Sequence, residues 1–176
     1  MSFLDQGYEL PKKEISNRYL NKFEEGDTRI RILGSAKTGY EYWLDQNGTV
    51  REGQIQKGDR PVRIKKKDIL SVSEFENSKH FWAFPIYNYN TASIQIAKVT
   101  SFTIQSNINT LIDDEDWGSP LNYDIVIKRT GKGFNDTEYS VVPKPAKGID
   151  PAILKDFKEL NIDMDAWMRS EDPFKQ

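Results

Sequence analysis

Residues 117–145, WGSPLNYDIVIKRTGKGFNDTEYSVVPKP, decide the fold of this chain. Two parts of this stretch, residues 123–129 and 137–142, are rich in the β-branched and aromatic side chains that are typical of strands. The residues between them include glycine, asparagine and aspartate, which tolerate the positive φ angles of tight turns. Pro143 ends the second strand because proline has no N–H to donate to a neighbouring strand. The stretch therefore predicts a β-hairpin.

Alternation of apolar and polar side chains predicts further strands before this hairpin. In residues 28–33, Ile30 and Ile32 would face the core, and Arg29 and Arg31 would lie on the opposite side. Strands are also predicted over residues 40–44, 79–87 and 93–99, and a helix over residues 100–112.

The hairpin stretch also carries a longer motif, W-G-x-P-x-x-Y-D-I-x-I-x-R-x-G-x-G followed by T-x-Y-x-V-x-P-x-P. The matching residues are Trp117, Gly118, Pro120, Tyr123, Asp124, Ile125, Ile127, Arg129, Gly131, Gly133, Thr137, Tyr139, Val141, Pro143 and Pro145. This motif resembles phage-encoded single-stranded DNA-binding proteins with an OB-fold core, and the likeness extends back to about Phe23. The resemblance implies a mainly-β OB-fold, a five-stranded barrel with one inserted helix, that binds single-stranded DNA during phage replication or recombination.

The chain divides into three parts on this interpretation. Residues 1–22 are polar and are expected to form a mobile N-terminal arm. Residues 23–147 would make the OB-fold core. Residues 148–176 would form a helical, acidic C-terminal extension, whose first helix begins with Asp150 as cap and Pro151 at the first helical position.

Composition excludes several classes of protein. The chain has 176 residues, no cysteine and a single histidine, so disulfides and sites built from cysteine or several histidines are excluded. No apolar run approaches the roughly 18 residues of a membrane span, and the first residues lack the pattern of a signal peptide. We expect a cytoplasmic protein, in the host cell if phage-encoded, with no membrane partner and no cofactor.

Charge is unevenly distributed along the chain. The net charge is −2, yet residues 29–82 hold 11 Lys and Arg against 7 Asp and Glu, whereas residues 150–176 hold 4 against 7. The basic middle of the chain is interleaved with aromatic residues, the combination by which single-strand binders attract phosphates and stack bases. The predicted nucleic-acid-binding residues are Arg29, Arg31, Tyr40, Tyr42, Trp43, Arg63, Lys65, Lys66, Lys67, Lys79, Phe81, Trp82, Lys128 and Arg129.

The aromatic residues among these could equally belong to the core. In residues 79–87, alternation places Trp82, Phe84 and Ile86 on one face, which we assign to the core. Phe81 and Tyr87 are then the better candidates for stacking, and Trp82 is included through the family resemblance. For residues 40–44 the sequence does not decide which face is exposed.

Catalysis is a weaker hypothesis than DNA binding. Residues 113–116 are four acidic side chains in a row, and clustered carboxylates can hold Mg²⁺ for phosphoryl chemistry. Consecutive side chains at a helix end fan outwards, however, and do not converge on one ion. The glycines at 131 and 133 lack the rest of a phosphate-binding loop. We expect no enzyme.

The acidic C-terminus adds a possible partner site. Glu171, Asp172 and Phe174 resemble the acidic, phenylalanine-containing tails by which single-strand binders recruit replication or recombination proteins. The rival hypothesis is an OB-fold structural or adaptor module that binds protein instead of nucleic acid. Recognition of double-stranded DNA is disfavoured because the chain lacks a helix-turn-helix or zinc motif.

Overall fold

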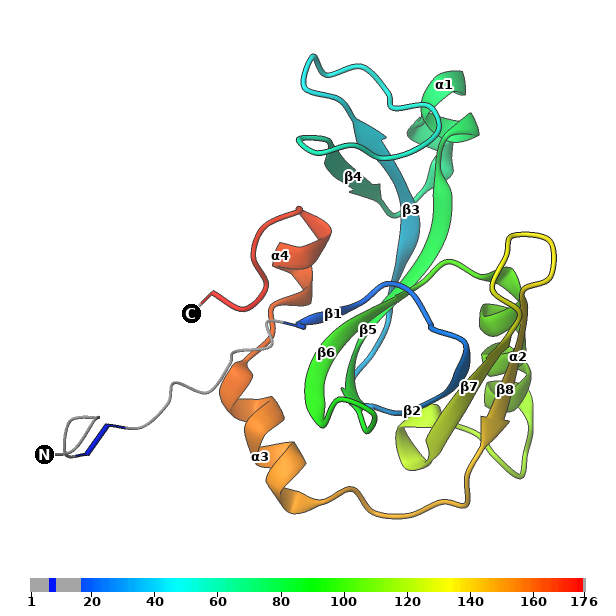
Figure 1. Cartoon of the computed structure of the whole chain (residues 1–176), viewed down its shortest axis with the longest axis vertical. Helices are drawn as coiled ribbons and strands as arrows, with labels where there is room; N and C mark the ends of the chain where they lie inside the picture. Colours follow the sequence, from blue (N-terminus) through cyan, green and yellow to red (C-terminus); the bar gives the residue numbers. More distant parts are fainter. Residues whose placement is uncertain (1–6, 9–16, 176) are drawn as a thin grey trace, which may run out of the picture.

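The computed structural model describes residues 7–8 and 17–175 of the chain (Figure 1). Most of the expected N-terminal arm, residues 1–6 and 9–16, lies outside the described residues. Near the end of the expected arm, Tyr19–Leu20 form β1, a short strand parallel to β6 (Ser93–Val99).

The described chain is mainly β, as predicted, and one helix is inserted between later strands. The strand order β1-β6-β5-β2-β7-β8 is consistent with an OB-like core. The core strands and the inserted helix are β2 (Gly26–Ile32), β5 (Lys79–Asn88), β6, α2 (Phe102–Asp113), β7 (Asp124–Thr130) and β8 (Glu138–Pro143). β7 and β8 pair as the predicted hairpin, from Ile125 opposite Pro143 to Thr130 opposite Glu138.

The sheet differs from a closed five-stranded barrel in two ways. It has eight strands within the described residues, and its two end strands, β1 and β8, do not pair with each other there, so a seam stays open between them. The additional strands β3 (Lys37–Leu44) and β4 (Arg60–Ile64) form an antiparallel hairpin. β5 is long enough to pair with β3 over its first half and with β2 at its end, which is why the sheet continues beyond the core.

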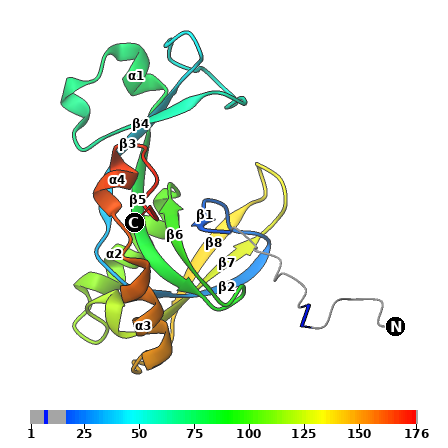
Figure 2. The same ribbon diagram turned by 90° about the vertical axis from the view of Figure 1, so that its left-hand side faces the viewer.

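A lobe projects from the core beyond these shared pairings. We call residues 42–76 the hairpin lobe; it contains the outer parts of β3 and β4, η1 (Lys67–Ile69) and α1 (Val72–Glu76) (Figures 1 and 2). Gly39 lies at its base, where β3 passes so close to β4 that a β-carbon would collide with the carbonyl oxygen of Ile64. This close approach of the two strands therefore requires glycine at position 39.

The core confirms the alternation predicted for β2. Ile30 and Ile32 are buried against apolar residues of β5, β7 and α2. Phe84, Ile86, Ile104, Ile108, Ile125 and Ile127 belong to the same cluster. The predicted inward face of β5 is thus correct.

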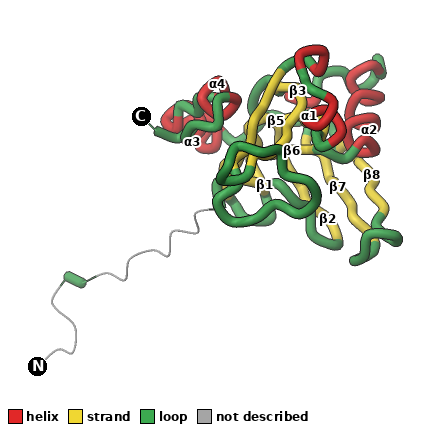
Figure 3. The backbone as a smooth tube through the Cα atoms, turned by 90° about the horizontal axis from the view of Figure 1, so that it is seen from above, coloured by secondary structure: helices red, strands yellow, loops and turns green. Residues whose placement is uncertain are grey.

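The C-terminal residues cover the other face of β5. α3 (Pro151–Leu160) begins as predicted, with the Asp150 side chain capping it, and α4 (Met164–Met168) follows. Figure 3 shows α3 and α4 on the opposite side of the strands from α2. Trp167 of α4 packs edge-on against Phe81 with ring centroids 5.4 Å apart, and Ala83 and Ile96 complete this second apolar cluster. Both faces of β5 are therefore buried.

We expect Trp167→Ala to destabilise the whole chain, because the substitution removes a buried indole from the second apolar cluster. The expected loss is about 3–5 kcal/mol of unfolding free energy, measured by urea denaturation. Phe102→Ala is the matched control, since this aromatic is 80% exposed at the start of α2. An unchanged urea midpoint for Trp167→Ala would mean that α4 is docked too loosely to contribute to the cooperative fold.

Candidate nucleic-acid interface

The two arginines predicted on β2 converge on one buried carboxylate. Asp124 is fully buried, and its Oδ1 accepts a hydrogen bond from Nε of Arg31 at 2.7 Å. Oδ2 accepts two bonds from Arg29, at 3.0 and 2.8 Å, and the Tyr89 hydroxyl donates to Oδ1. Arg31 is only 3% exposed and also donates to the carbonyl of Lys147, so it does not reach a phosphate in this arrangement. Arg29 remains partly exposed.

The charge on Asp124 is stabilised by these donors. Burial alone would raise the pKa of the Asp124 carboxyl, but the hydrogen bonds from Arg31 and Arg29 outweigh it and hold the pKa below its ordinary value. Burial and the neighbouring Asp124 charge in turn raise the pKa of Tyr89. Arg29 and Arg31 therefore stabilise the buried charge of Asp124, which is a role in the fold.

A second buried carboxylate lies under the hairpin lobe. Glu41 accepts a hydrogen bond from Arg63 at 2.8 Å and one from Lys98 at 2.6 Å, and the indole N–H of Trp43 donates to it at 3.3 Å. Burial would raise the pKa of Glu41, yet Lys98 and Arg63 together hold it below its ordinary value. The guanidinium of Arg63 also lies 3.7 Å from the centre of the Trp167 ring and donates to the backbone carbonyl of that residue. α4 therefore covers Arg63.

A groove begins beside this ion cluster. A pocket of about 230 Å³ is lined by Trp43, Arg51 and Lys79 at the base of the hairpin lobe. It shares Asn21, Lys98 and Thr100 with a smaller pocket of about 80 Å³ that reaches Lys22 and Tyr139. We call the two together the seam groove, because the second pocket is lined by residues 21–23 after β1, the end of β6 and Tyr139 of β8, on the open side of the sheet. Four cations, one carboxylate and three aromatic side chains line it: Lys22, Arg51, Lys79, Lys98, Glu41, Phe23, Trp43 and Tyr139.

The seam groove brings together only two of the predicted binding residues, Trp43 and Lys79. Arg51 and Lys98 were not predicted. Arg51 is paired with Asp59, to whose carboxylate it donates at 2.9 and 3.1 Å. The alternation of residues 93–99 places Lys98 on a strand, and this was the signal in the sequence that could have found it. The residues that lie beside Lys98 depend on strand pairing, which the sequence does not reveal.

Several predicted aromatic residues are buried. Phe81 has no exposed surface because Trp167 covers it, and this corrects its prediction as a stacking residue. Tyr42 is also buried, with its hydroxyl near Glu74. Tyr40 is half-buried against His80, at a centroid distance of 5.2 Å. The physical reason is the same for Phe81 and Tyr42: each lies on a strand face that another element covers.

The remaining predicted aromatics and cations lie elsewhere on the molecule. Trp82 is half-buried in a separate apolar pocket, and Tyr87 is half-buried against Tyr89. Lys128 lies 3.6 Å from Asp27. Arg129 donates to the Phe23 carbonyl at 2.7 Å and so ties the hairpin to the start of the core.

The basic cluster and the tail both lie outside the seam groove. Lys65, Lys66 and Lys67 are exposed on the hairpin lobe, and the ammonium of Lys67 lies 5.5 Å from the Phe75 ring centre. In the tail, Glu171 pairs with Arg169 and the Asp172 carboxylate accepts the N–H of Phe174. The half-buried Phe174 ring contacts Tyr19 edge-on, at a centroid distance of 5.8 Å, and Arg18 lies over it. Phe174 is thus docked on its own chain.

Residues 7–8 and 17–175 contain neither a metal-binding cluster nor a membrane-spanning helix. No three acidic or histidine side chains there are grouped closely enough to hold a metal ion. None of the helices in the same residues is both long enough and apolar enough to cross a membrane.

Comparison with known proteins adds one relative. Over 138 residues the chain is 29% identical to the probable ssDNA-binding protein of Escherichia phage T5, and the match covers 68% of this chain and 52% of that protein. The predicted resemblance is confirmed. The chain thus spans about half the length of this phage relative. No family model matches the chain, and no solved structure matches it.

We expect the buried carboxylates to make the fold sensitive to acid. Because the folded pKa of Asp124 is lowered, its charge contributes stability above the ordinary carboxyl pKa of about 4, and this contribution is lost as the pH falls towards the folded value. Asp124→Asn should cost about 3–5 kcal/mol at neutral pH, because it removes the partner of a buried arginine. Urea denaturation between neutral pH and pH ~3 measures both effects.

Asp27→Asn is the control for this substitution, because Asp27 is exposed and lies in a loose pair with Lys128. It should leave both the stability and its pH dependence close to those of the wild type. Equal pH profiles for the wild type and Asp124→Asn would show that the Asp124 cluster does not govern acid stability.

Proposed function

We propose that this protein binds single-stranded DNA in the seam groove, with little sequence preference, during phage DNA replication or recombination. The observation that carries the proposal is the groove itself, where cations from the hairpin lobe and the core lie beside an accessible indole. The name of the phage T5 relative supports single-stranded DNA as the ligand. On this proposal the protein acts by binding alone, in the cytoplasm of the infected cell.

The groove has the chemistry that a single strand requires. Arg51, Lys79, Lys98 and Lys22 would attract successive phosphates, and the Trp43 ring would stack on a base. Such contacts use features that every nucleotide has, the phosphate charge and the flat face of the base. Binding of this kind discriminates poorly between sequences.

The lysines of the hairpin lobe would extend the phosphate track outside the groove. Lys65, Lys66 and Lys67 are exposed and close together in the chain, and neighbouring positive charges repel one another unless an anion lies between them. Recruitment of replication or recombination proteins through Glu171, Asp172 and Phe174 also remains a proposal. It would require the docked Phe174 ring to leave Tyr19 and Arg18.

We expect substitutions in the groove to weaken DNA binding in two distinguishable ways. Trp43→Ala should cost about 1–3 kcal/mol of binding free energy through lost stacking, with little change in the dependence on salt. Lys79→Ala should reduce the slope of log affinity against log salt by about 0.7, because one single-strand phosphate contact is lost. Fluorescence anisotropy of labelled oligo-dT over a range of salt concentrations measures both quantities.

The matched control is Lys158→Ala, which removes an exposed lysine of α3 outside the groove. Its affinity and salt slope should equal those of the wild type. If Trp43→Ala and Lys79→Ala also bind like the wild type, DNA occupies another surface. If the wild-type chain does not bind oligo-dT even at low salt, the adaptor hypothesis replaces this proposal.

We expect the combined Lys65→Ala, Lys66→Ala and Lys67→Ala variant to bind long oligo-dT more weakly and to lower the salt slope by about 2, since each single-strand phosphate contact contributes about 0.7. An oligonucleotide only long enough to fill the groove should show a smaller loss, because it does not reach the hairpin lobe. An unchanged slope on the long oligonucleotide would exclude these lysines from the interface.

A further inference from the structure

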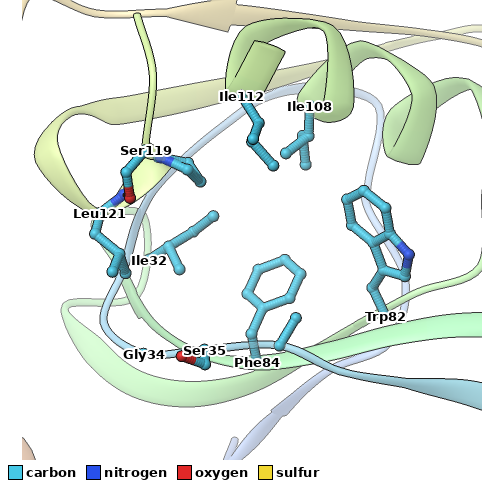
Figure 4. A pocket seen from close by; sticks show the side chains of 11 residues that line it. Ile32, Gly34, Ser35, Trp82, Phe84, Ile108, Ile112, Ser119 and Leu121 are labelled. Carbon is cyan, nitrogen blue, oxygen red and sulfur yellow. The ribbon is translucent and has the colours of Figure 1, made fainter.

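An apolar pocket lies apart from the seam groove and shares no lining residue with it. It has a volume of about 390 Å³ and opens between α2, the end of β2, β5 and η2 (Pro120–Asn122). Figure 4 shows Ile32, Trp82, Phe84, Ile108, Ile112 and Leu121 pointing towards its centre. No charged side chain lines the pocket. Its size and lining suit an apolar group such as an aromatic ring.

Four acidic residues lie in the chain segment that connects two parts of the pocket wall. Ile112 on its wall is followed by the four exposed carboxylates of residues 113–116, and the chain returns to the wall at Ser119. A phosphate backbone would be repelled here, whereas an apolar side chain with a cation beside it would be attracted on both counts. The chemistry therefore favours a protein ligand over DNA.

The chain itself presents a side chain of this kind. Phe134, in the loop between β7 and β8, is 100% exposed. Lys132, two residues before it, has a side chain that is 87% exposed, and its ammonium lies 3.8 Å from Glu25 in a surface pair that costs little to break. The loop is held in shape by internal hydrogen bonds: the Gly133 N–H donates to Asp136 at 2.7 Å, and the Thr137 hydroxyl donates to the Gly133 carbonyl. A structured loop loses little conformational entropy when its tip binds.

We propose that Phe134 of one copy of this protein inserts into the apolar pocket of the next copy, with Lys132 facing the carboxylates of residues 113–116. The pocket and the loop lie at opposite ends of β7, since η2 precedes this strand and the loop follows it (Figure 1). Seven residues of strand place them roughly 20 Å apart. One chain therefore does not fill its own pocket.

The proposed contact joins two different surfaces, so it leaves a free loop at one end of a pair and a free pocket at the other. Contacts of this type propagate as an open row, or as a ring where the rotation between copies closes, instead of forming a symmetric dimer. A single inserted ring is a small interface and would be weak in free solution. Neighbours on one DNA strand have a high effective concentration, which would favour the contact there; this last step rests on the proposed function.

Disulfide trapping tests the contact without DNA, and the chain contains no cysteine of its own. Ser35→Cys places a thiol on the pocket wall, and Asn135→Cys places one beside Phe134; both positions are exposed. When the two variants are mixed and oxidised, we expect the mixed disulfide in clear excess over the two same-site disulfides. Adding Phe134→Ala to the Asn135→Cys chain should reduce the mixed product to the proportion of random collisions. Adding Phe102→Ala, another exposed aromatic, should not.

DNA binding distinguishes this proposal from stacking of Phe134 on a base. On oligo-dT that holds one protomer, Phe134→Ala should bind like the wild type. On oligo-dT that holds many, its apparent affinity should fall by about tenfold or more, because neighbour contacts are lost. An equal loss on both lengths, or a mixed disulfide that does not depend on Phe134, would overturn the proposal. If the chain bound no DNA at all, only the proposed function would fail, and the disulfide result would still decide this contact.

Discussion

The buried carboxylate of Asp124 is the constraint on which the core depends. It starts β7, receives both arginines of β2 and the Tyr89 hydroxyl that follows β5, and lies 3.5 Å from the ammonium of Lys147. A buried charge is tolerated only when enough donors surround it, so these elements must keep their relative positions. The cations of β2 are therefore committed to the fold. An anionic ligand has to find most of its cations elsewhere, and in the proposed interface the seam groove and the hairpin lobe supply them.

β5 illustrates how far local pattern predicts structure. Alternation correctly assigned Trp82, Phe84 and Ile86 to the inner side, because one face of a strand is a local property of the sequence. The same reasoning predicted that Phe81 is exposed to solvent. No local pattern indicated that Trp167, which lies 86 positions later in the chain, packs on it. A strand face that the local sequence predicts to be exposed can be covered by a helix from a distant part of the chain. Long-range cover of this kind is the main reason that the candidate site was only partly predicted.

The hairpin and the mainly-β class were predictable because turn residues and β-branched strands act over a few residues. The seam groove was not predictable, because it lies where strands are not paired. Within the described residues β8 pairs with β7 alone, and side chains line the gap towards β1 and the end of β6. Arg51, from the loop after β3, and Lys98, from β6, both line the larger pocket of the groove. Neither residue lies in a run of like charges, so the charge distribution along the chain predicted Lys65, Lys66 and Lys67 as DNA-binding residues instead.

Glu41 determines which cation of the groove can change partner. Its Oε1 receives both Lys98 and the Trp43 indole, and its Oε2 receives Arg63. If Lys98 turned towards a phosphate, each carboxylate oxygen would still keep one donor, so no buried charge would be left unpaired. Arg63 has no such freedom, because it is also held by the Trp167 ring and carbonyl. In the proposed interface, Lys98 is therefore the cation that exchanges between the fold and the DNA, and Arg63 stays with the fold.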